Sequence, residues 1–455
     1  IVFGCPPGIV KDFARRGEDL PFRYVIPIRT FMKGKNYFDF EFIVYSFLFL
    51  KNNREKKISF YCTADQNERF HVILDETLYG PKFHQILRSQ FRKVVTQARY
   101  SEKKASQFYA FLDRVAADQV LFEDYQNYLK SHVGDRAILA GMKKRLIGLL
   151  SADKWLKKSC GSDMASILAK NYILCAQLKN EMSLFALTSE ENRERYTHDA
   201  INFNIFDGNN SIVIDGKDDK SRKMTVVQSN PSVFDVYIDN DKSKSCHIDL
   251  SKVDPEIEPV KIEAINKPYM GATFLGVGSG FAANRKDSCV IIWSEGKGIM
   301  VDALPDTNRQ CLSQGISEND IQYILLTHVH SDHDAGLIEK ILQGERAKII
   351  STQIIFDSFL RKAAAITRFP IDVIEGFIDF LDVEPNKMIK LPGFRSSYFS
   401  FDYSLHSIPT GRFVLTYKDK KTGLKKTISH SGDTKFDMGK INAWYEKGAF
   451  PLKRR

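Results

Sequence analysis

The chain has 455 residues, with 43% hydrophobic and 27% charged residues and a formal net charge of +10. This composition excludes a disordered or collagen-like chain, and the length predicts about two to four domains that each bury a core. The positive charge is shared about equally between residues 1–265 and 266–455. We therefore expect a small anionic ligand more than a long nucleic-acid track.

The cysteines and the apolar runs bear on where the protein works. Seven scattered cysteines form no C-x-x-C pair, which argues against a disulfide framework and favours a reducing, cytoplasmic setting. The longest apolar run, Phe38–Leu50, is interrupted by Asp39 and Glu41 and is too short to span a bilayer. We interpret it as a buried strand or core helix. Because the chain starts at Ile1 and ends in basic residues, we expect it to be a fragment, so a missing signal peptide proves little.

Residues 1–190 are predicted to form an α/β region followed by a helical region, with no recognisable role. The runs Tyr24–Ile28 and Ile58–Cys62 are bounded by polar or Pro/Gly breaks and predict strands, while Gly4–Gly8 predicts a turn. From Pro81 to Leu187 apolar residues recur at helical spacing with Lys and Arg between them.

Residues 191–262 are predicted to form a small antiparallel β module. Short alternating runs, the first of which is Ile201–Ile205, are separated by Asn, Asp and Gly turns, and Asp207–Asn210 predicts a hairpin. The Pro-rich, acidic stretch Asp254–Pro259 predicts a linker. A third unit then extends over residues 268–455.

The third unit opens on a glycine-rich loop that does not fit dinucleotide binding. A strand at Ala272–Leu275 leads into Gly276–Gly280, but the next predicted element is another strand, Cys289–Trp293, where a dinucleotide fold needs a helix. A further strand, Ile299–Asp302, ends in a carboxylate.

A dense cluster of metal-binding side chains follows the predicted strand Ile321–Thr327. In an extended segment residues two apart point the same way, so His328 and His330 converge. When the chain then bends into a helix, Asp332 and His333 face a neighbouring point. Three imidazoles and a carboxylate in six residues suit a divalent metal with nitrogen and oxygen ligands.

The segment His328-x-His330-x-Asp332-His333, with Gly336 behind it, resembles the signature of metallo-β-lactamase-fold hydrolases. Thr273–Gly280 and the strand ending at Asp302 resemble the start of the ribonuclease Z and cyclic-nucleotide phosphodiesterase branch. His406–Thr410 resembles the family's next metal-binding histidine, and Ser431–Thr434 resembles the loop that carries its bridging aspartate. The resemblance covers about residues 270–455. It implies an α+β protein in which a C-terminal αββα sandwich follows the α/β-helical region and the β module.

The resemblance also implies site roles. His328, His330 and His406 would bind one divalent ion, Asp332 and His333 a second, and Asp433 would bridge both. Zinc is the expected metal, with manganese or iron as alternatives. The two ions would share a water and convert it to a bridging hydroxide, and Asp332 could accept a proton.

Three neighbouring residues and one missing ligand have weaker assignments. Asp302 would support the site, and Asp334 would support it or be exposed. The family normally has another histidine after the bridging aspartate, and none follows Asp433 here, so we expect it beyond Arg455. His430 would have a strand or supporting role.

The function expected from this resemblance is a dinuclear metal-dependent phosphodiesterase acting on a small phosphodiester such as a cyclic nucleotide. Alternatives are a metal-containing sensor without turnover, an RNA-processing nuclease, and a scaffold with a vestigial site. Ribonuclease Z itself is disfavoured because its glycine-proline-rich arm and Ala-x-Asp-x-His segment are missing, and residues 351–390 look helical. The charged hairpin tip after Phe413–Tyr417 would be solvated or dock a phosphate.

Overall fold

The structure is a computed structural model of the chain. It describes all residues except 34, 50–56, 131–135, 161–162, 184–199, 217–221, 240, 254–266, 420 and 436–455. The predicted linker Asp254–Pro259 lies outside the described residues. None of the described helices is both long and apolar enough to cross a membrane.

The N-terminal region is built on a parallel sheet with strand order β1-β2-β5-β6. Thr63 starts one of its helices with a capping box to Gln66. The apolar run Phe38–Leu50 contains a buried helix, one of its two predicted forms. The elements are β1 (Val2–Phe3), α1 (Ile9–Arg16), β2 (Arg23–Val25), β3 (Phe31–Met32), β4 (Lys35–Asn36), α2 (Glu41–Phe49), β5 (Ile58–Cys62), α3 (Ala64–Thr77) and β6 (Ile201–Ile205).

The assignment of Ile201–Ile205 to the antiparallel module is wrong. This strand, β6, pairs in parallel with β5, and Ile58 lies opposite Ile201. Parallel strands need a long crossover, which the intervening helices supply. The predicted hairpin at Asp207–Asn210 is wrong for the same reason: its turn joins two different sheets.

A helical bundle occupies the region where helical spacing predicted it, and its side chains form a separate apolar core. Ser101 caps its second helix by accepting a hydrogen bond from the backbone N–H of Lys104. The helices are α4 (Phe83–Gln97), α5 (Glu102–Ala116), α6 (Gln119–Lys130), α7 (Arg136–Ala152), α8 (Lys154–Cys160) and α9 (Met164–Ser183).

The small β module is an antiparallel sheet with its own apolar cluster, as predicted apart from β6. In the middle of β8 and β9 buried side chains alternate with partly buried ones, so one face covers the core. The strands are β7 (Ser211–Asp215), β8 (Lys223–Asn230), β9 (Val233–Ile238) and β10 (Asp241–Asp249), followed by a single 3-10 turn at Leu250–Lys252.

The C-terminal region contains two sheets that share one apolar core with the N-terminal sheet. The larger sheet consists of β11 (Met270–Gly276), β12 (Cys289–Ser294), β13 (Lys297–Val301), β14 (Ile321–Leu325), β15 (Ala347–Ser351) and β16 (Ile378–Asp382). The smaller sheet consists of β17 (Met388–Lys390), β18 (Ser397–Ser404), β19 (Thr410–Lys418) and β20 (Lys425–His430). The helices are α11 (Thr307–Ser313), α12 (Ser331–Leu342), α13 (Gln353–Thr367) and α14 (Ile371–Gly376), and a 3-10 turn lies at Glu318–Asp320.

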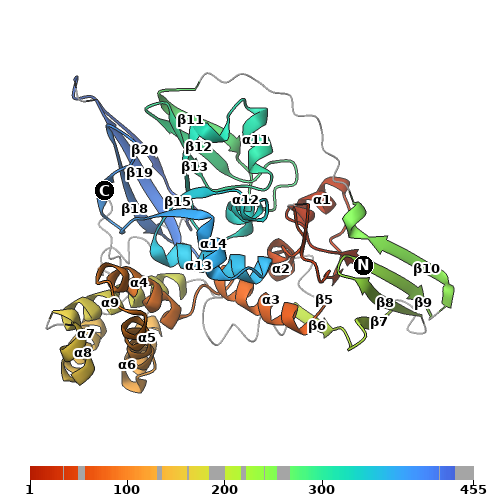
Figure 1. Cartoon of the computed structure of the whole chain (residues 1–455), viewed down its shortest axis with the longest axis horizontal. Helices are drawn as coiled ribbons and strands as arrows, with labels where there is room; N and C mark the ends of the chain where they lie inside the picture. Colours follow the sequence, from red (N-terminus) through yellow and green to blue (C-terminus); the bar gives the residue numbers. More distant parts are fainter. Residues whose placement is uncertain are drawn as a thin grey trace.

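The described C-terminal region agrees with the predicted α+β sandwich. Residues 351–390 are helical only in their first part, because β16 and β17 follow α14. Helix α13 lies at the centre of the molecule, where it packs against α3, α4, α12 and α14 (Figure 1). Strand β4 also packs against α12, so the N-terminal region lies directly against the helix that carries the histidine motif.

Candidate metal centre

The histidine motif lies where β14 ends and α12 begins. His330 is the N-cap of α12, so Asp332 and His333 fall in its first turn. Carboxylates are favourable there because the helix dipole is positive at this end. Gly336 lets α12 lie close to the loop after β13: a Cβ at this position would be 2.2 Å from the backbone oxygen of Leu304.

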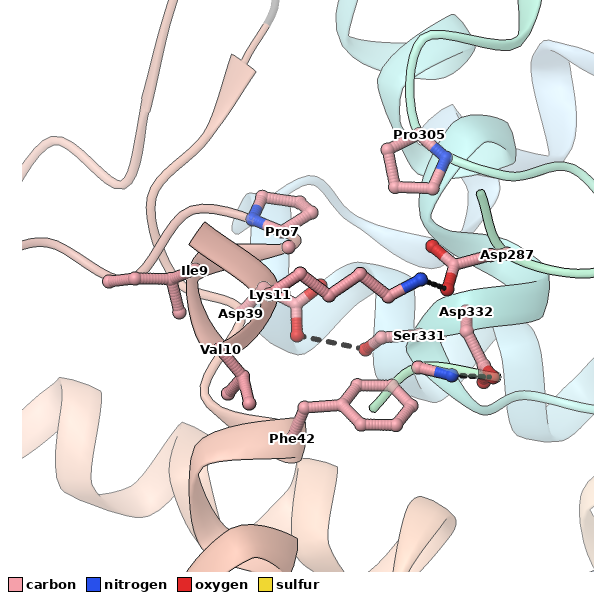
Figure 2. A pocket seen from close by; sticks show the side chains of 12 residues that line it. Pro7, Ile9, Val10, Lys11, Asp39, Phe42, Asp287, Pro305, Ser331 and Asp332 are labelled. Atoms are coloured by element: carbon pink, nitrogen blue, oxygen red, sulfur yellow. Dashed lines mark hydrogen bonds and ion pairs between the residues drawn. The ribbon is translucent and has the colours of Figure 1, made fainter. Parts of the chain in front are cut away.

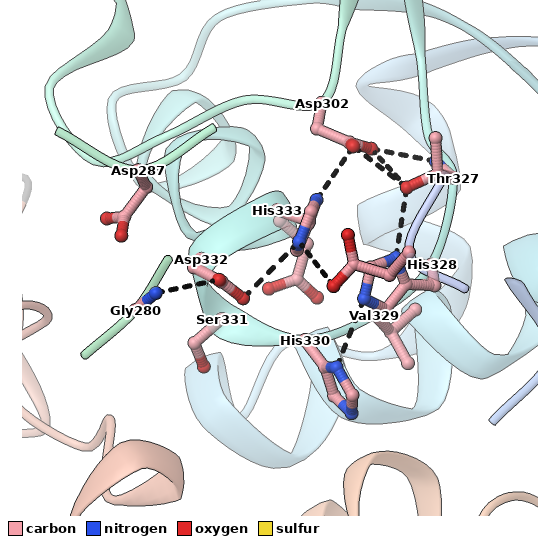
Figure 3. Close-up of polar contacts among 12 residues, drawn as sticks. Gly280, Asp287, Asp302, Thr327, His328, Val329, His330, Ser331, Asp332 and His333 are labelled. Carbon is pink, nitrogen blue, oxygen red and sulfur yellow. Dashed lines mark hydrogen bonds and ion pairs between the residues drawn. The ribbon is translucent and has the colours of Figure 1, made fainter. Parts of the chain in front are cut away.

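Three imidazole rings converge as the spacing of the motif predicts. The Nε2 atom of His328 lies 3.1 Å from Nδ1 of His330 (Figure 3). Nε2 of His406 lies 3.2 Å from the same Nδ1. His406 comes from the loop after β18, far away in the sequence. A tetrahedral zinc ion with bonds of about 2.0–2.1 Å separates its ligands by about 3.3 Å, close to these spacings.

A second group overlaps the first. His328, His333 and Asp433 offer ligand atoms that all lie within 4.8 Å of one another. Oδ2 of Asp433, on the loop after β20, is 3.6 Å from Nε2 of His333. Oδ1 of Asp332 is 3.5 Å from the same nitrogen, and its Oδ2 accepts a hydrogen bond of 3.1 Å from the backbone N–H of Gly280. The structure thus brings together all six residues that the resemblance singled out.

Asp302 supports the rings of His333 and His328 on the side away from the ligand cluster, as expected. Its carboxylate accepts hydrogen bonds from Nδ1 of His333 at 2.7 Å and from the Thr327 hydroxyl at 2.8 Å (Figure 3). Since Thr327 gives its proton to Asp302, its oxygen can accept from Nδ1 of His328, 3.0 Å away. Asp302 has a positive φ of 60°, a conformation that costs energy in non-glycine residues and recurs at functional sites.

The protonation states follow from burial and neighbouring charge. Burial lowers the pKa of His330 and His406 to about 3, and that of His328 well below its usual value, so these rings are neutral. Burial also disfavours the charged form of His333, but the carboxylates of Asp332 and Asp302 raise its pKa well above the usual value. Burial raises the pKa of Asp332 to about 6.

These contacts form a donor set that fits a cation. The carbonyl oxygen of Thr77 can only accept, so Nε2 of His330 carries the proton in their 2.9 Å hydrogen bond. In the neutral ring Nδ1 then has a lone pair, and it faces Nε2 of His328, whose own proton is on Nδ1. Two lone pairs at 3.1 Å repel unless a positive charge lies between them. The three imidazoles therefore favour a divalent metal ion in their midst.

The structure also tests the predicted roles of two nearby residues, His430 and Asp334. His430 lies on β20, where its ring stacks on Phe413 and its Nδ1 accepts from the backbone N–H of Gly432, in keeping with its predicted strand role. Asp334 was predicted either to support the site or to be exposed, and it is fully buried, so the exposed alternative is wrong. Its Oδ1 accepts from Nζ of Lys362 at 2.7 Å.

Sequence reasoning missed Lys362 and the N-terminal contacts. Lys362 is a charged residue on the buried face of α13, beside Phe359 and Ile366. A lysine within an otherwise apolar helix face was the available signal. By contrast, a backbone carbonyl such as that of Thr77 leaves no trace in a sequence.

Comparisons with known proteins identify a matching family model and several similar sequences. The family model for the Anti-Pycsar protein Apyc1 matches residues 270–451. The cAMP/cGMP-dependent 3',5'-cAMP/cGMP phosphodiesterase B of Dictyostelium discoideum is 33% identical over 43% of this chain and 17% of its own length. Ribonuclease Z of Methanopyrus kandleri is 27% identical over 30% of this chain and 47% of its own length. The chain thus spans less than half the length of either relative.

Among solved structures, the short form of human tRNase Z is similar at 21% identity, covering 35% of this chain and 68% of the other, with a TM-score of 0.28. The residues matched by the family model, 270–451, include the whole histidine motif. From residue 270 onwards the chain therefore resembles the ribonuclease Z and cyclic-nucleotide phosphodiesterase branch of the metallo-β-lactamase-fold hydrolases, in agreement with the sequence motif.

Proposed function

We propose that residues 268–455 form a dinuclear metal-dependent phosphodiesterase that hydrolyses a small phosphodiester such as a cyclic nucleotide. The observation that carries the proposal is the pair of overlapping ligand groups that share His328. In this proposal His328, His330 and His406 hold one ion, Asp332 and His333 hold the other, and Asp433 bridges them. Two divalent cations, in our proposal zinc, would lower the pKa of a water towards 7 and stabilise charge on a phosphate oxygen.

Neighbouring residues hold the proposed ligands of the second ion in position. Asp302 fixes the ring of His333, and the N–H of Gly280 fixes the carboxylate of Asp332. The Oδ1 atom of Asp332 lies 3.5 Å from Nε2 of His333, so this carboxylate is within the proposed ligand cluster. We propose Asp332 as the acceptor of the proton that the attacking water loses.

The choice of a small phosphodiester rests on the relatives. The Dictyostelium protein matches a larger share of this chain than ribonuclease Z does, and its name specifies 3',5'-cAMP/cGMP. The evenly spread positive charge also suits a small anion. The proposal includes a reducing, cytoplasmic setting, which the unpaired state of Cys5, Cys62, Cys175, Cys246, Cys289 and Cys311 supports.

The test measures turnover by the zinc-loaded chain of bis-p-nitrophenyl phosphate, 3',5'-cAMP, 3',5'-cGMP and a precursor tRNA. The proposal expects hydrolysis of the first three, and loss of activity in His330→Ala and Asp433→Asn. His247→Ala is a matched control, because Nδ1 of His247 also contacts an aspartate, Asp235 at 2.8 Å, but in the β module. Cleavage of the tRNA alone would favour the nuclease, and bound metal without turnover would favour the sensor.

A further inference from the structure

The N-terminal region contacts the metal-binding segment directly. The Thr77 carbonyl, at the end of α3, accepts the hydrogen bond from Nε2 of His330 at 2.9 Å. The hydroxyl of Tyr45, on α2, donates to the same carbonyl at 2.9 Å, and its ring meets the His330 ring edge-on at 5.7 Å. The side of the His330 ring that faces away from the ligand cluster is thus fixed by residues that precede the motif by more than 250 positions.

This arrangement sets His330 apart from the other two rings of the motif. The outer nitrogens of His328 and His333 contact Thr327 and Asp302, which belong to the C-terminal region itself. The outer nitrogen of His330 instead contacts the N-terminal region. Because an outer hydrogen bond fixes the tautomer and orientation of a ligating histidine, the N-terminal region directs Nδ1 of His330 towards the centre.

The residue after His330 is held in the same way. The Ser331 hydroxyl lies 2.9 Å from a carboxylate oxygen of Asp39 (Figure 2). It also lies 2.9 Å from a carboxylate oxygen of Glu41, and the Ser331 backbone N–H donates to Glu41 at 3.3 Å. Nζ of Lys362 donates to Glu41 at 3.3 Å and to the carbonyl of Val329 at 2.7 Å. All these groups are buried. Glu41 therefore ties residues 329–331 to the N-terminal region.

A third contact reaches Asp332 through the glycine-rich loop. Gly280, whose N–H holds Asp332, lies against the ring of Phe42 on α2, and a Cβ at this position would be 2.0 Å from the ring. Phe281 also packs edge-on to Phe42, at 5.1 Å. The cavity between Pro7, Phe42, Gly280 and Asp332 holds only about 20 Å³, room for one water (Figure 2). The N-terminal region thus closes this side of the site.

We infer that the N-terminal α/β region completes the metal centre, and that Glu41 and Tyr45 are positioning residues for its ligands. The family match starts at residue 270, so this part of the centre lies outside it. The inference goes beyond the proposed function because it concerns metal affinity and holds whichever ester is the substrate, or none. Affinity measured on the full chain tests it without reference to turnover.

The experiment compares zinc affinity, by competition with a chromophoric chelator, in the full chain and in Tyr45→Phe and Glu41→Gln. Losing the direct outer partner of a metal ligand costs about 10- to 100-fold in affinity. Tyr45 and Glu41 act one contact further out, through the Thr77 carbonyl and through Ser331, so we expect a loss at the low end, about 3- to 10-fold, for each variant. Tyr323→Phe is the matched control for tyrosine, since its hydroxyl donates to the Pro392 carbonyl at 3.2 Å away from the motif. Glu339→Gln is the control for a buried glutamate, since Glu339 accepts from the N–H of Asp306.

A second readout separates positioning from general destabilisation. Absorption bands of the cobalt-loaded protein report the ligand field, so we expect them to change in Tyr45→Phe and to be retained in Tyr323→Phe. If Glu41→Gln fails to fold, the result with Tyr45→Phe decides. Wild-type zinc affinity and wild-type cobalt bands in a folded Tyr45→Phe protein would overturn the inference.

Discussion

Replacing Lys362 with methionine should destabilise the protein strongly, although the variant keeps an apolar side chain of similar length. Lys362 is fully buried, and its Nζ is 2.7 Å from Asp334 and 3.3 Å from Glu41. Removing one partner of a buried ion pair leaves an uncompensated charge and costs about 3–5 kcal/mol. An exposed pair contributes about 0–1 kcal/mol, so Arg88→Met, which breaks the exposed pair with Asp113, is the control.

The cost of Lys362→Met should also depend on pH. Burial raises the pKa of Asp334 to about 8 and of Asp39 to about 7, above the usual value of about 3.9 for the unfolded chain. Below about pH 4 these groups are protonated in both states. As the pH rises to 8, the unfolded chain releases protons that the folded chain retains, so folding loses stability. Without Lys362 the folded pKa values rise further, and the loss is larger.

The assay is thermal and urea unfolding of the wild type and both variants at pH 5 and pH 8. We expect the cost of Lys362→Met to be greater at pH 8 than at pH 5, and the cost of Arg88→Met to be small at both. A Lys362→Met cost below about 1 kcal/mol at pH 8, within the range of exposed pairs, would refute the reasoning. A cost that falls between pH 5 and pH 8 would refute the role of the buried carboxylates.

Three further predictions concern metal binding, helix packing and thiol exposure. Free zinc at about 100 times its dissociation constant should stabilise the protein by about 2.7 kcal/mol, seen as a rise in melting temperature that a chelator reverses; an unchanged melting temperature would contradict the metal centre. Gly336→Ala should destabilise the protein in urea unfolding because its Cβ would clash with a backbone oxygen, whereas Gly148→Ala in α7, with open space around it, should be neutral or gain about 0.5–1 kcal/mol. Exposed Cys246 should react with a thiol reagent far faster than Cys289, whose thiol pKa burial raises well above its usual value; equal rates would contradict that burial.

Much of the C-terminal region could be predicted because its signals are local. The convergence of His328 and His330 follows from two-residue alternation at the end of a strand, and the place of His333 follows from the first turn of a helix. The carboxylate at the end of β13 likewise indicated support for the site, and Asp302 provides it. Local bonding sets these positions, so a short stretch of sequence contains the information.

The partners of those residues depend on contacts between distant parts of the chain. A strand pattern at Ile201–Ile205 does not say which sheet accepts it, because every strand presents the same backbone hydrogen-bonding groups, and only packing selected β5. The outer partner of His330 is a backbone carbonyl at Thr77, a group that every residue has. The role of Glu41 also depends on burial beside Ser331, since an exposed glutamate there would have been an ordinary surface charge. The sequence alone thus specified the candidate ligand motif at residues 328–333, whereas the tertiary structure decided that the N-terminal region encloses it, because burial and shared hydrogen bonds arise only when distant segments pack together.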